Sequence, residues 1–503
     1  MSQPFDMIGI VGAGSMGSCM TMLFAENDMQ VSVYDVSGQN IDNLYDALQE
    51  GLDKDLHHRV TRFKDLDQLM ESLGGKDANK LLIFSIPHGS AADKVISDIR
   101  EHLLHGDIIL DGGNEWYENA ERRQKELAPD GIAYLSMGVS GGYQSARRGP
   151  SISPSGDKAA LNGVMPLLEK IAAKDPKTGQ PCVVNLGPAG CGHYVKMVHN
   201  GIEQGILGIV SEAWELLYKC LHTDLDTISQ ILKNWEDEGE LKRNFLVGIG
   251  ADICRRHKED RPGHVVNEVQ DKVVQDADDS EGTGVWSVME AAKRHVSTLR
   301  AHHCADRAER MQVVEALGQS IGAARNQHVE DKFKTEFFED LRLAVYCACL
   351  ASFTQGLNLI ARASADEGWN VSLASCIRIW REGCIIRSEY IADLLQPLFE
   401  KEPGTKNMMT LQPVADEIKR TVPHLRKVVQ YGLEWNAHVP TLSASYEFFK
   451  YCGGKHLPSQ FMEAELDYFG AHSYDMKSEG DGEAKKGTGR REYGKHHFEW
   501  KEA

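Results

Sequence analysis

Short apolar runs alternate with amphipathic stretches along the first third of the chain. The runs cover residues 7–11, 31–34, 81–86, 107–111 and 133–137, and each ends at a Gly, a Pro or a polar residue. Apolar strands that alternate with helices are typical of a parallel sheet covered on both faces. We therefore expect a doubly wound, mainly parallel α/β domain over residues 1–188.

Beyond about residue 190 the apolar residues recur at helical spacing. The predicted helices cover residues 194–218, 224–236, 287–301, 307–322 and 340–365. Gln355-Gly356 in the last helix matches Gln204-Gly205 in the first, which indicates an internal duplication. We expect an all-helical domain over residues 189–460 that carries substrate and dimer contacts.

Two segments lack this helical pattern. Residues 255–281 and the following Gly282-Thr283-Gly284 are charged or rich in Gly and Asp, and they predict a loop. Residues 461–503 form a tail, aromatic up to Tyr474 and then polar. A polar tail buries little apolar surface by itself, so it is either disordered or laid against a partner subunit.

Length and charge limit the class of protein. A chain of 503 residues exceeds the roughly 250–300 residues at which a single core stops growing, so at least two domains are expected. The net charge of −19 argues against nucleic acid as the main partner. It also means that an anionic substrate must be held by a local basic pocket.

Targeting and redox signals favour the cytoplasm. No apolar run reaches the roughly 18 residues that span a membrane, and a first strand near Met7 leaves no room for a signal peptide. The 11 Cys form no Cys-x-x-Cys pair, which is typical of reduced thiols. The His doublets at 57–58, 302–303 and 496–497 lack metal-ligand spacing, so no metal is expected.

A glycine-rich turn follows the first strand directly. It contains Gly12, Gly14 and Gly17, with Ser15 and Met16 before the last glycine. This turn, set between a strand and a helix with an acid about 20 residues on, indicates a Rossmann dinucleotide site. The first glycine permits the turn, the second admits the pyrophosphate and the third lets helix and strand pack closely. The helix N-terminus offers N–H groups to the phosphates.

The ends of the other strands supply further cofactor and substrate candidates. Asp35 can bind a ribose 2′-hydroxyl but repels a 2′-phosphate, and Val36 and Ser37 add no Arg, so we expect NAD rather than NADP. Ile86 and Asn114 also lie at strand ends, where ligands of parallel sheets gather. The Ser140-Gly141-Gly142 turn and Asn114 are candidate substrate contacts; the alternative is that they are ordinary turn residues.

Four polar residues share one face of the first predicted helix of the second domain. Lys196, His199, Asn200 and Glu203 are three, one and three residues apart, so they can converge on one small molecule. The preceding Gly187, Gly190 and Gly192 are expected to let the backbone approach that molecule. The alternative is an amphipathic helix whose polar stripe faces water.

Together these motifs resemble the decarboxylating 6-phosphogluconate dehydrogenase family of the pentose phosphate pathway, within the β-hydroxyacid dehydrogenase superfamily. The resemblance covers nearly the whole chain. Further matches are Asp111-Gly112-Gly113-Asn114, Arg147 with Gly149-Pro150-Ser151, Gly282-Thr283-Gly284 with Trp286, Gly368-Trp369, Trp380 with residues 383–388, and residues 467–472.

The resemblance implies a Rossmann domain, a large all-helical domain and a tail that inserts into the other subunit of a homodimer. Lys196 matches the family's general base, which takes the C3 hydroxyl proton while hydride leaves C3. Glu203 matches the acid that protonates C1 of the enediol after a metal-independent loss of CO2. The implied substrate contacts are Asn114, Ser140, Gly141, Gly142, His199, Asn200 and, from the partner, His472.

The chain departs from the family at two places. The family has Asn-Arg-Thr for NADP where this chain has Asp35-Val36-Ser37, which again favours NAD. The family binds the 6-phosphate with a Tyr after the catalytic Glu, a Lys before Gly-Thr-Gly, an Arg in the next helix and an Arg before Asp-Tyr-Phe-Gly. The corresponding residues here are Gln204, Glu281, Arg307 and Leu466.

These departures leave the substrate open. Two cations are lost and a carboxylate is gained, which favours an unphosphorylated hexonate or related 3-hydroxy sugar acid bound through Gln204 and Glu281. Alternatively, Arg147, Arg148 or the tail cations at 485, 486, 490 and 491 bind the phosphate. Two other functions are a β-hydroxyacid dehydrogenase that does not decarboxylate and a catalytically silent NAD-binding protein.

Overall fold

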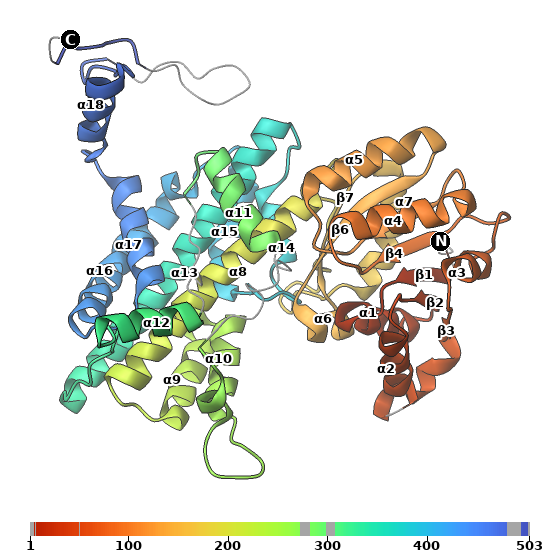
Figure 1. Cartoon of the computed structure of the whole chain (residues 1–503), viewed down its shortest axis with the longest axis horizontal. Coiled ribbons are helices and arrows are strands. Elements are labelled where there is room, and N and C mark those ends of the chain that lie inside the picture. The colour runs from red at the N-terminus through yellow and green to blue at the C-terminus, as the bar shows by residue number, and fades with distance from the viewer. Residues whose placement is uncertain are drawn as a thin grey trace.

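The computed structural model describes residues 5, 7–49, 51–271, 282–297, 307–479 and 494–500. Its N-terminal part is built on one seven-stranded sheet (Figure 1). The strands are β1 (Met7–Val11), β2 (Gln30–Tyr34), β3 (Val60–Arg62), β4 (Leu81–Phe84), β5 (Ile108–Asp111), β6 (Ala133–Ser140) and β7 (Ser151–Ser155). Their order is β3-β2-β1-β4-β5-β6-β7, and all neighbours are parallel except β6 and β7.

Helices cover both faces of this sheet. The apolar sides of α1 (Ser15–Glu26), α2 (Gly38–Gln49) and α7 (Lys158–Ile171) form one core with the strands. A second core lies on the other face, under α3 (Leu66–Ser72), α4 (Ser90–Ile99) and α5 (Tyr117–Leu127). The short α6 (Gly142–Arg148) follows β6. The doubly wound α/β prediction is therefore confirmed.

The second part is helical, also as predicted. Helix α8 (Cys191–Glu215) continues as one π-helical turn (Leu216–Cys220). The helices after it are α9 (Leu225–Asp237), α10 (Phe245–Arg255), α11 (Gly282–Lys293), α12 (Arg307–Leu317), α13 (Asp331–Glu367), α14 (Leu373–Ile379), α15 (Glu389–Lys401), α16 (Gln412–Glu434), α17 (Pro440–Gly453) and α18 (Ser459–Gly470).

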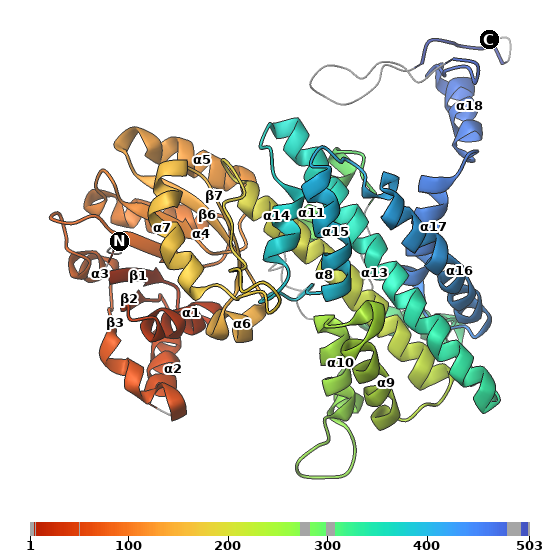
Figure 2. The ribbon, with the colours of Figure 1, turned by 180° about the vertical axis from the view of Figure 1, so that it is seen from behind.

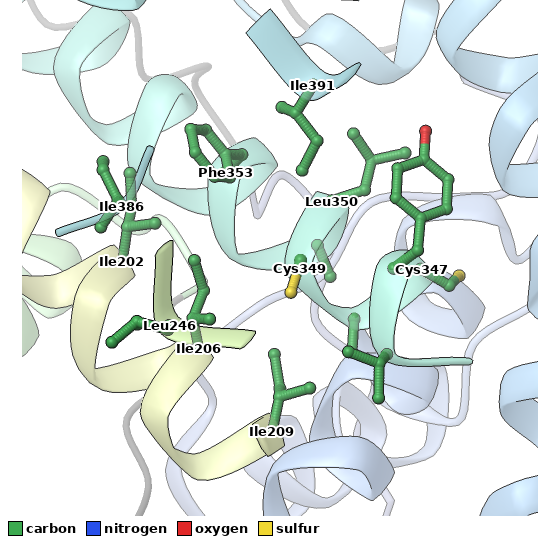
Figure 3. Close-up of a cluster of buried hydrophobic side chains, with 14 of the residues drawn as sticks. Ile202, Ile206, Ile209, Leu246, Cys347, Cys349, Leu350, Phe353, Ile386 and Ile391 are labelled. Carbon is green, nitrogen blue, oxygen red and sulfur yellow. The ribbon is translucent and has the colours of Figure 1, made fainter. Parts of the chain in front are cut away.

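Helices α8 and α13 lie side by side at the centre of this part (Figures 2 and 3). Ile202 and Ile206 of α8 and Leu350 of α13 point into the same buried cluster. An 18-residue window of α13 has a mean hydropathy of 1.5, which would suffice for a membrane span, but 94% of it is buried in the protein. The sequence analysis found no such run; here its apolar side chains form the core instead.

Three local predictions were incomplete or wrong. Gly282-Thr283-Gly284, expected in a loop, is the first turn of α11, which ends at Lys293 rather than near residue 301. Thr283 is buried, and this packing offsets the low helix propensity of the two glycines. Strands β3 and β7 were not predicted, because β3 has three residues and Pro154 interrupts the β7 sequence.

Helix α8 also supports the helix that leads to the tail. Both carboxylate oxygens of buried Glu212 accept backbone N–H groups, from Thr441 at 2.7 Å and Leu442 at 2.9 Å. These groups lie in the first turn of α17, where N–H groups have no partner within the helix. Burial raises the pKa of Glu212 to about 7.

The tail forms a small module that stands away from the body of the protein (Figures 1 and 2). Residues 494–500 fold back onto α18 around buried Asp467, whose carboxylate accepts from the Phe498 backbone N–H, from Trp500 Nε1–H and from the Ser473 N–H. The hydrogen bond of the His497 ring, 2.9 Å from the same carboxylate, and these three hydrogen bonds hold the pKa of Asp467 well below its usual range, against the effect of burial.

Candidate active site

The glycine turn after β1 has the geometry expected of a dinucleotide site. Gly12 has a φ of +103°, and a Cβ there would lie 2.1 Å from the Ser85 carbonyl oxygen. A Cβ on Gly17 would lie 2.0 Å from the carbonyl oxygen of Gly12. A Cβ on Gly14 would meet no atom within 4 Å. The first and third glycines are thus required by packing, and the second leaves room at the N-terminus of α1 for a pyrophosphate.

Asp35 lies at the end of β2, beside this turn. Its Oδ2 accepts the Ala13 backbone N–H at 2.6 Å and its Oδ1 accepts the Ser37 N–H at 2.7 Å. The carboxylate is therefore fixed next to the glycine turn. The next side chain, Val36, is 89% exposed and supplies no positive charge. These contacts place a fixed negative charge where the adenosine ribose binds in a Rossmann site.

The other predicted cofactor residues gather at the same edge of the sheet. Ser15 is exposed and Met16 half-buried in the first turn of α1. Ile86, past the end of β4, lies 3.1 Å from the Cβ position of Gly12 through its Cγ2. Asn114 is exposed beyond β5. The structure thus brings the predicted residues of β1, β4 and β5 to one edge.

Helix α8 lies directly against the β6–β7 pair. A Cβ on Gly138 of β6 would lie 2.6 Å from Lys196 Cβ, and Ser153 Oγ of β7 donates to the Gly192 carbonyl at 3.0 Å. A Cβ on Gly192 would lie 2.2 Å from the Ser153 carbonyl oxygen. Lys196 therefore lies next to the carboxyl-terminal half of β6.

This packing corrects the role predicted for the glycines before α8. A Cβ on Gly190 would lie 2.4 Å from the Tyr117 carbonyl oxygen, and the atom nearest to a Cβ on Gly187 would be the Trp369 carbonyl oxygen at 3.1 Å. Protein atoms fill the space beside both glycines, so neither glycine leaves room for a ligand. Gly138 of β6 is required for the same reason, because a side chain there would overlap neighbouring atoms. Its only signal in the sequence was its place directly after the apolar run 133–137.

Burial sets the protonation of the two basic residues of α8. Lys196 is 8% exposed, and burial lowers its pKa, although the nearby Glu203 carboxylate opposes that shift. His199 is fully buried; burial first and the Lys196 charge second hold its pKa well below the usual value. His199 is therefore neutral near pH 7, and Lys196 is closer to its deprotonated, basic form than a surface lysine.

The polar face of α8 continues toward α11. His199 Nδ1 lies 3.0 Å from Asn200 Oδ1, and Asn200 Nδ2 donates to Thr283 Oγ1 at 3.0 Å. His199 Nε2 is buried and has no hydrogen-bond partner among the residues that the structure describes. With Nδ1 donating to the amide oxygen, Nε2 carries a lone pair that can accept from a ligand hydroxyl.

Gln204 and Glu203 complete this face. Gln204 is buried, and its amide nitrogen lies 2.6 Å from the Cβ position of Gly284 in α11. Glu203 is 23% exposed, and its Oε2 lies 3.8 Å from His199 Nδ1. The four predicted residues thus share one largely enclosed face between β6 and α11, rather than a stripe in water. Thr283 was missed as a site residue because its segment was assigned to a loop.

The Ser140-Gly141-Gly142 turn joins the two parts of the chain. Ser140 is buried at the end of β6, and Gly141 has a φ of +105°. A Cβ on Gly141 would lie 2.3 Å from the Gly383 carbonyl oxygen, which also accepts the Ser151 N–H at 2.9 Å. The turn is thus held against the segment between α14 and α15.

Among the described predicted substrate residues, Arg147 and His472 are not brought to this face. Glu281 and the tail cations at 485–491 lie outside the described residues, as does the side chain of Arg307 at the start of α12. Arg147 forms a bidentate ion pair with Glu26 of α1, at 2.5 and 2.7 Å. His472 is exposed in the tail module, apart from α8 of its own chain (Figure 1).

Comparison with known proteins gives the same picture. Residues 7–187 match the model of the NAD binding domain of 6-phosphogluconate dehydrogenase, and residues 192–500 match that of its C-terminal domain. The chain belongs to the 6-phosphogluconate dehydrogenase family. This confirms the resemblance stated from the sequence.

Individual members of the 6-phosphogluconate dehydrogenase family align over nearly their full length. The decarboxylating enzyme of Emericella nidulans is 46% identical over 97% of this chain and 100% of that protein. A decarboxylating 6-phosphogluconate dehydrogenase of Oryza sativa is 33% identical over 93% of this chain and 95% of that protein. The Plasmodium falciparum enzyme, solved with NADP+ and with 6-phosphogluconate, is 31% identical with a TM-score of 0.82, covering 94% of this chain and 98% of that one.

The contact between Gly138 and Lys196 can be tested by a single methyl group. Gly138→Ala should lower the free energy of unfolding by about 1–3 kcal/mol, because the new Cβ overlaps Lys196 Cβ and Ser153 Oγ. Urea unfolding measures this change. The matched control is Gly163→Ala in α7, where a Cβ meets no atom within 4 Å and which should stabilise by about 0.5–1 kcal/mol. Equal stability of both variants would contradict the close packing.

Proposed function

We propose that this chain catalyses the NAD(P)-dependent oxidative decarboxylation of a 3-hydroxy sugar acid to a ketose and CO2. The observation that carries the proposal is the enclosed face of α8, where Lys196 has a lowered pKa and packs against β6, with Glu203 two helical turns further along the same face. Family membership supports the same reaction. It does not favour the non-decarboxylating and silent alternatives.

The residues of this face divide the work among them. Gly12–Gly17 would hold the pyrophosphate of the dinucleotide, whose nicotinamide would supply the acceptor for the C3 hydride. Lys196, lowered in pKa by burial, takes the proton of the C3 hydroxyl, and its ammonium then stabilises the developing enolate oxygen as CO2 leaves. Neutral His199 and Asn200 orient hydroxyl groups. Glu203, partly exposed, is placed to return a proton to C1 of the enediol.

The part of the site that would take the substrate's phosphate end departs most from the family's pattern. Gln204 is uncharged and buried beside Gly284, and Leu466 stands where the family has an Arg. Arg147, one candidate for a replacement cation, is already paired with Glu26. A phosphate dianion needs several charge-assisted hydrogen bonds, each worth about 1.5–3 kcal/mol. We therefore propose that the preferred substrate is an unphosphorylated hexonate or a related acid.

Turnover of gluconate and of 6-phosphogluconate tests this proposal. We expect equal amounts of NADH and CO2, and a higher kcat/KM for an unphosphorylated acid. Leu466→Arg should raise kcat/KM for 6-phosphogluconate by about tenfold, as one charge-assisted bond predicts, and leave gluconate unchanged. The charge control is Glu465→Gln, on the exposed side of α18. Robust turnover of 6-phosphogluconate alone would contradict the unphosphorylated substrate, and reduced cofactor without CO2 would contradict decarboxylation.

NAD is the cofactor that the structure favours. Asp35 is fixed beside the glycine turn by the N–H groups of Ala13 and Ser37, so a 2′-phosphate would meet a carboxylate there. The described neighbours Val36 and Ser37 offer no cation in exchange.

Removal of this charge should weaken the preference for NAD. In Asp35→Asn the ratio of kcat/KM for NAD to that for NADP should fall by about tenfold or more. The variant no longer repels the 2′-phosphate of NADP, and it loses the charge-assisted hydrogen bonds of the carboxylate with the ribose hydroxyl groups of NAD. Asp46→Asn, an exposed site on α2, should leave the ratio unchanged. A wild-type preference for NADP would contradict the proposal.

We further propose a cytoplasmic homodimer in which each tail reaches its partner's active site. The tail module stands apart from α8 (Figure 1). It exposes Phe461 (68%) and Phe469 (71%), and the His472 ring lies 5.8 Å from that of Phe469. An exposed apolar surface of this kind favours association. The ten cysteines among the described residues form no disulfide, as a reducing compartment favours.

Mixing two defective proteins tests the exchange of tails. Lys196→Met and His472→Ala should each be nearly inactive as homodimers. After unfolding and refolding together, random pairing should restore about a quarter of wild-type activity, because one site in each mixed dimer has both residues. No recovery in verified mixed dimers would show that His472 acts within its own chain. Ultracentrifugation measures the dimer.

A further inference from the structure

A histidine pair lies on a hairpin at the far end of the helical part, in the loop below α10 in Figure 1. His257 and His264 face each other across an antiparallel bridge. Lys258 N–H donates to the Gly263 carbonyl at 2.9 Å, and Val265 N–H donates to the Arg256 carbonyl at 3.0 Å. The two histidines are therefore a non-hydrogen-bonded pair, in which side chains lie closest together. Their ring centroids are 4.1 Å apart.

A carboxylate completes the group. Asp226, in the first turn of α9, places Oδ1 3.3 Å from His257 Nε2 and 3.4 Å from His264 Nε2. Asp226 is not needed to cap its helix, because Asp224 accepts the Thr227 N–H at 2.9 Å. Its carboxylate is thus available to the two imidazoles.

These distances match the edges of a coordination polyhedron better than two good hydrogen bonds. Zinc binds His nitrogen and carboxylate oxygen at about 2.0–2.1 Å, so two ligands of a tetrahedral ion lie about 3.3–3.4 Å apart. Both nitrogens lie at that distance from Asp226 Oδ1, and the three ligand atoms lie within 4.8 Å of one another.

The surrounding charges do not oppose a cation. Glu268 forms ion pairs with Lys258 at 2.6 Å and with Arg261 at 2.7 Å, and Glu259 forms one with Arg256. The positive charges near the two histidines are therefore compensated. The whole chain carries a net charge of −19. His264 is largely buried, whereas Asp226 and His257 are about half exposed, which leaves a side open for a water ligand.

We propose that Asp226, His257 and His264 form a zinc site outside the active site. The ion joins the hairpin over residues 257–264 to the N-terminus of α9, with water as the fourth ligand. Neutral imidazoles and a carboxylate are the ligands that Zn2+ takes in proteins, and the open fourth position is compatible with the exposure of the group. No metal was expected from the sequence because the His doublets lack metal-ligand spacing; Asp226 lies 31 and 38 residues before these two histidines, so no local pattern joins the three.

Zinc binding by the chelator-treated, tag-free protein tests the site. Competition with a chromophoric chelator should give one Zn2+ per chain that Asp226→Asn and His264→Ala each weaken by about tenfold or more. The matched control, His456→Ala, removes an exposed histidine elsewhere and should bind as the wild type does. Equal binding by all four proteins, or none by the wild type, would overturn the proposal.

Two further measurements separate coordination from adventitious binding. Co2+ in the site should give the intense visible bands of a tetrahedral complex in the wild type and not in Asp226→Asn. Zinc should slow tryptic cleavage after Arg256 and Lys258 in the wild type but not in His264→Ala; Arg261 precedes Pro262 and is not cut. A pale octahedral Co2+ spectrum, or protection that is the same in the variant, would contradict the site.

Discussion

The contact of α8 with the β6–β7 pair is the constraint on which the active site depends. Gly138 and Gly192 let two backbones approach to a distance that no side chain would permit. Lys196 is thereby placed at the sheet and removed from water at once, and the loss of water lowers its pKa. His199, one turn later, is neutral for the same reason. Packing geometry, rather than a dedicated charge partner, favours the neutral amine form of this lysine.

The rest of α8 contacts other helices of the second part. Its apolar side packs on α13, and its polar side meets α11 through Asn200 and Thr283. Further along, Glu212 binds the first turn of α17, the helix that leads to the tail module. One helix therefore fixes the position of the reacting lysine, the substrate-facing amides and the base of the tail.

The sequence predicted those features whose physics is local. The glycine turn, Asp35 and the spacing of Lys196 to Glu203 depend on neighbours in the chain. Periodicity gave α8, α9, α11, α12 and α13 but not α10 or the helices from α14 to α18. What the sequence missed in the sites depends on contacts between distant segments. Gly138 and Gly190 are required because segments distant in the chain pack closely against them. Thr283 lies in a helix that packs on α8. The group of Asp226, His257 and His264 joins residues about thirty positions apart and has no local pattern.

The position of α8 also bears on how ligands enter and leave. This helix is at once the outer layer of the sheet domain and the central helix of the second part, so no flexible hinge separates the two. The Gly141–Gly383 contact locks the same junction from another side. A jaw-like closing of the two domains would have to break both contacts. The same contacts that bury the lysine therefore resist such a closing, because both parts of the chain share the backbone around Lys196.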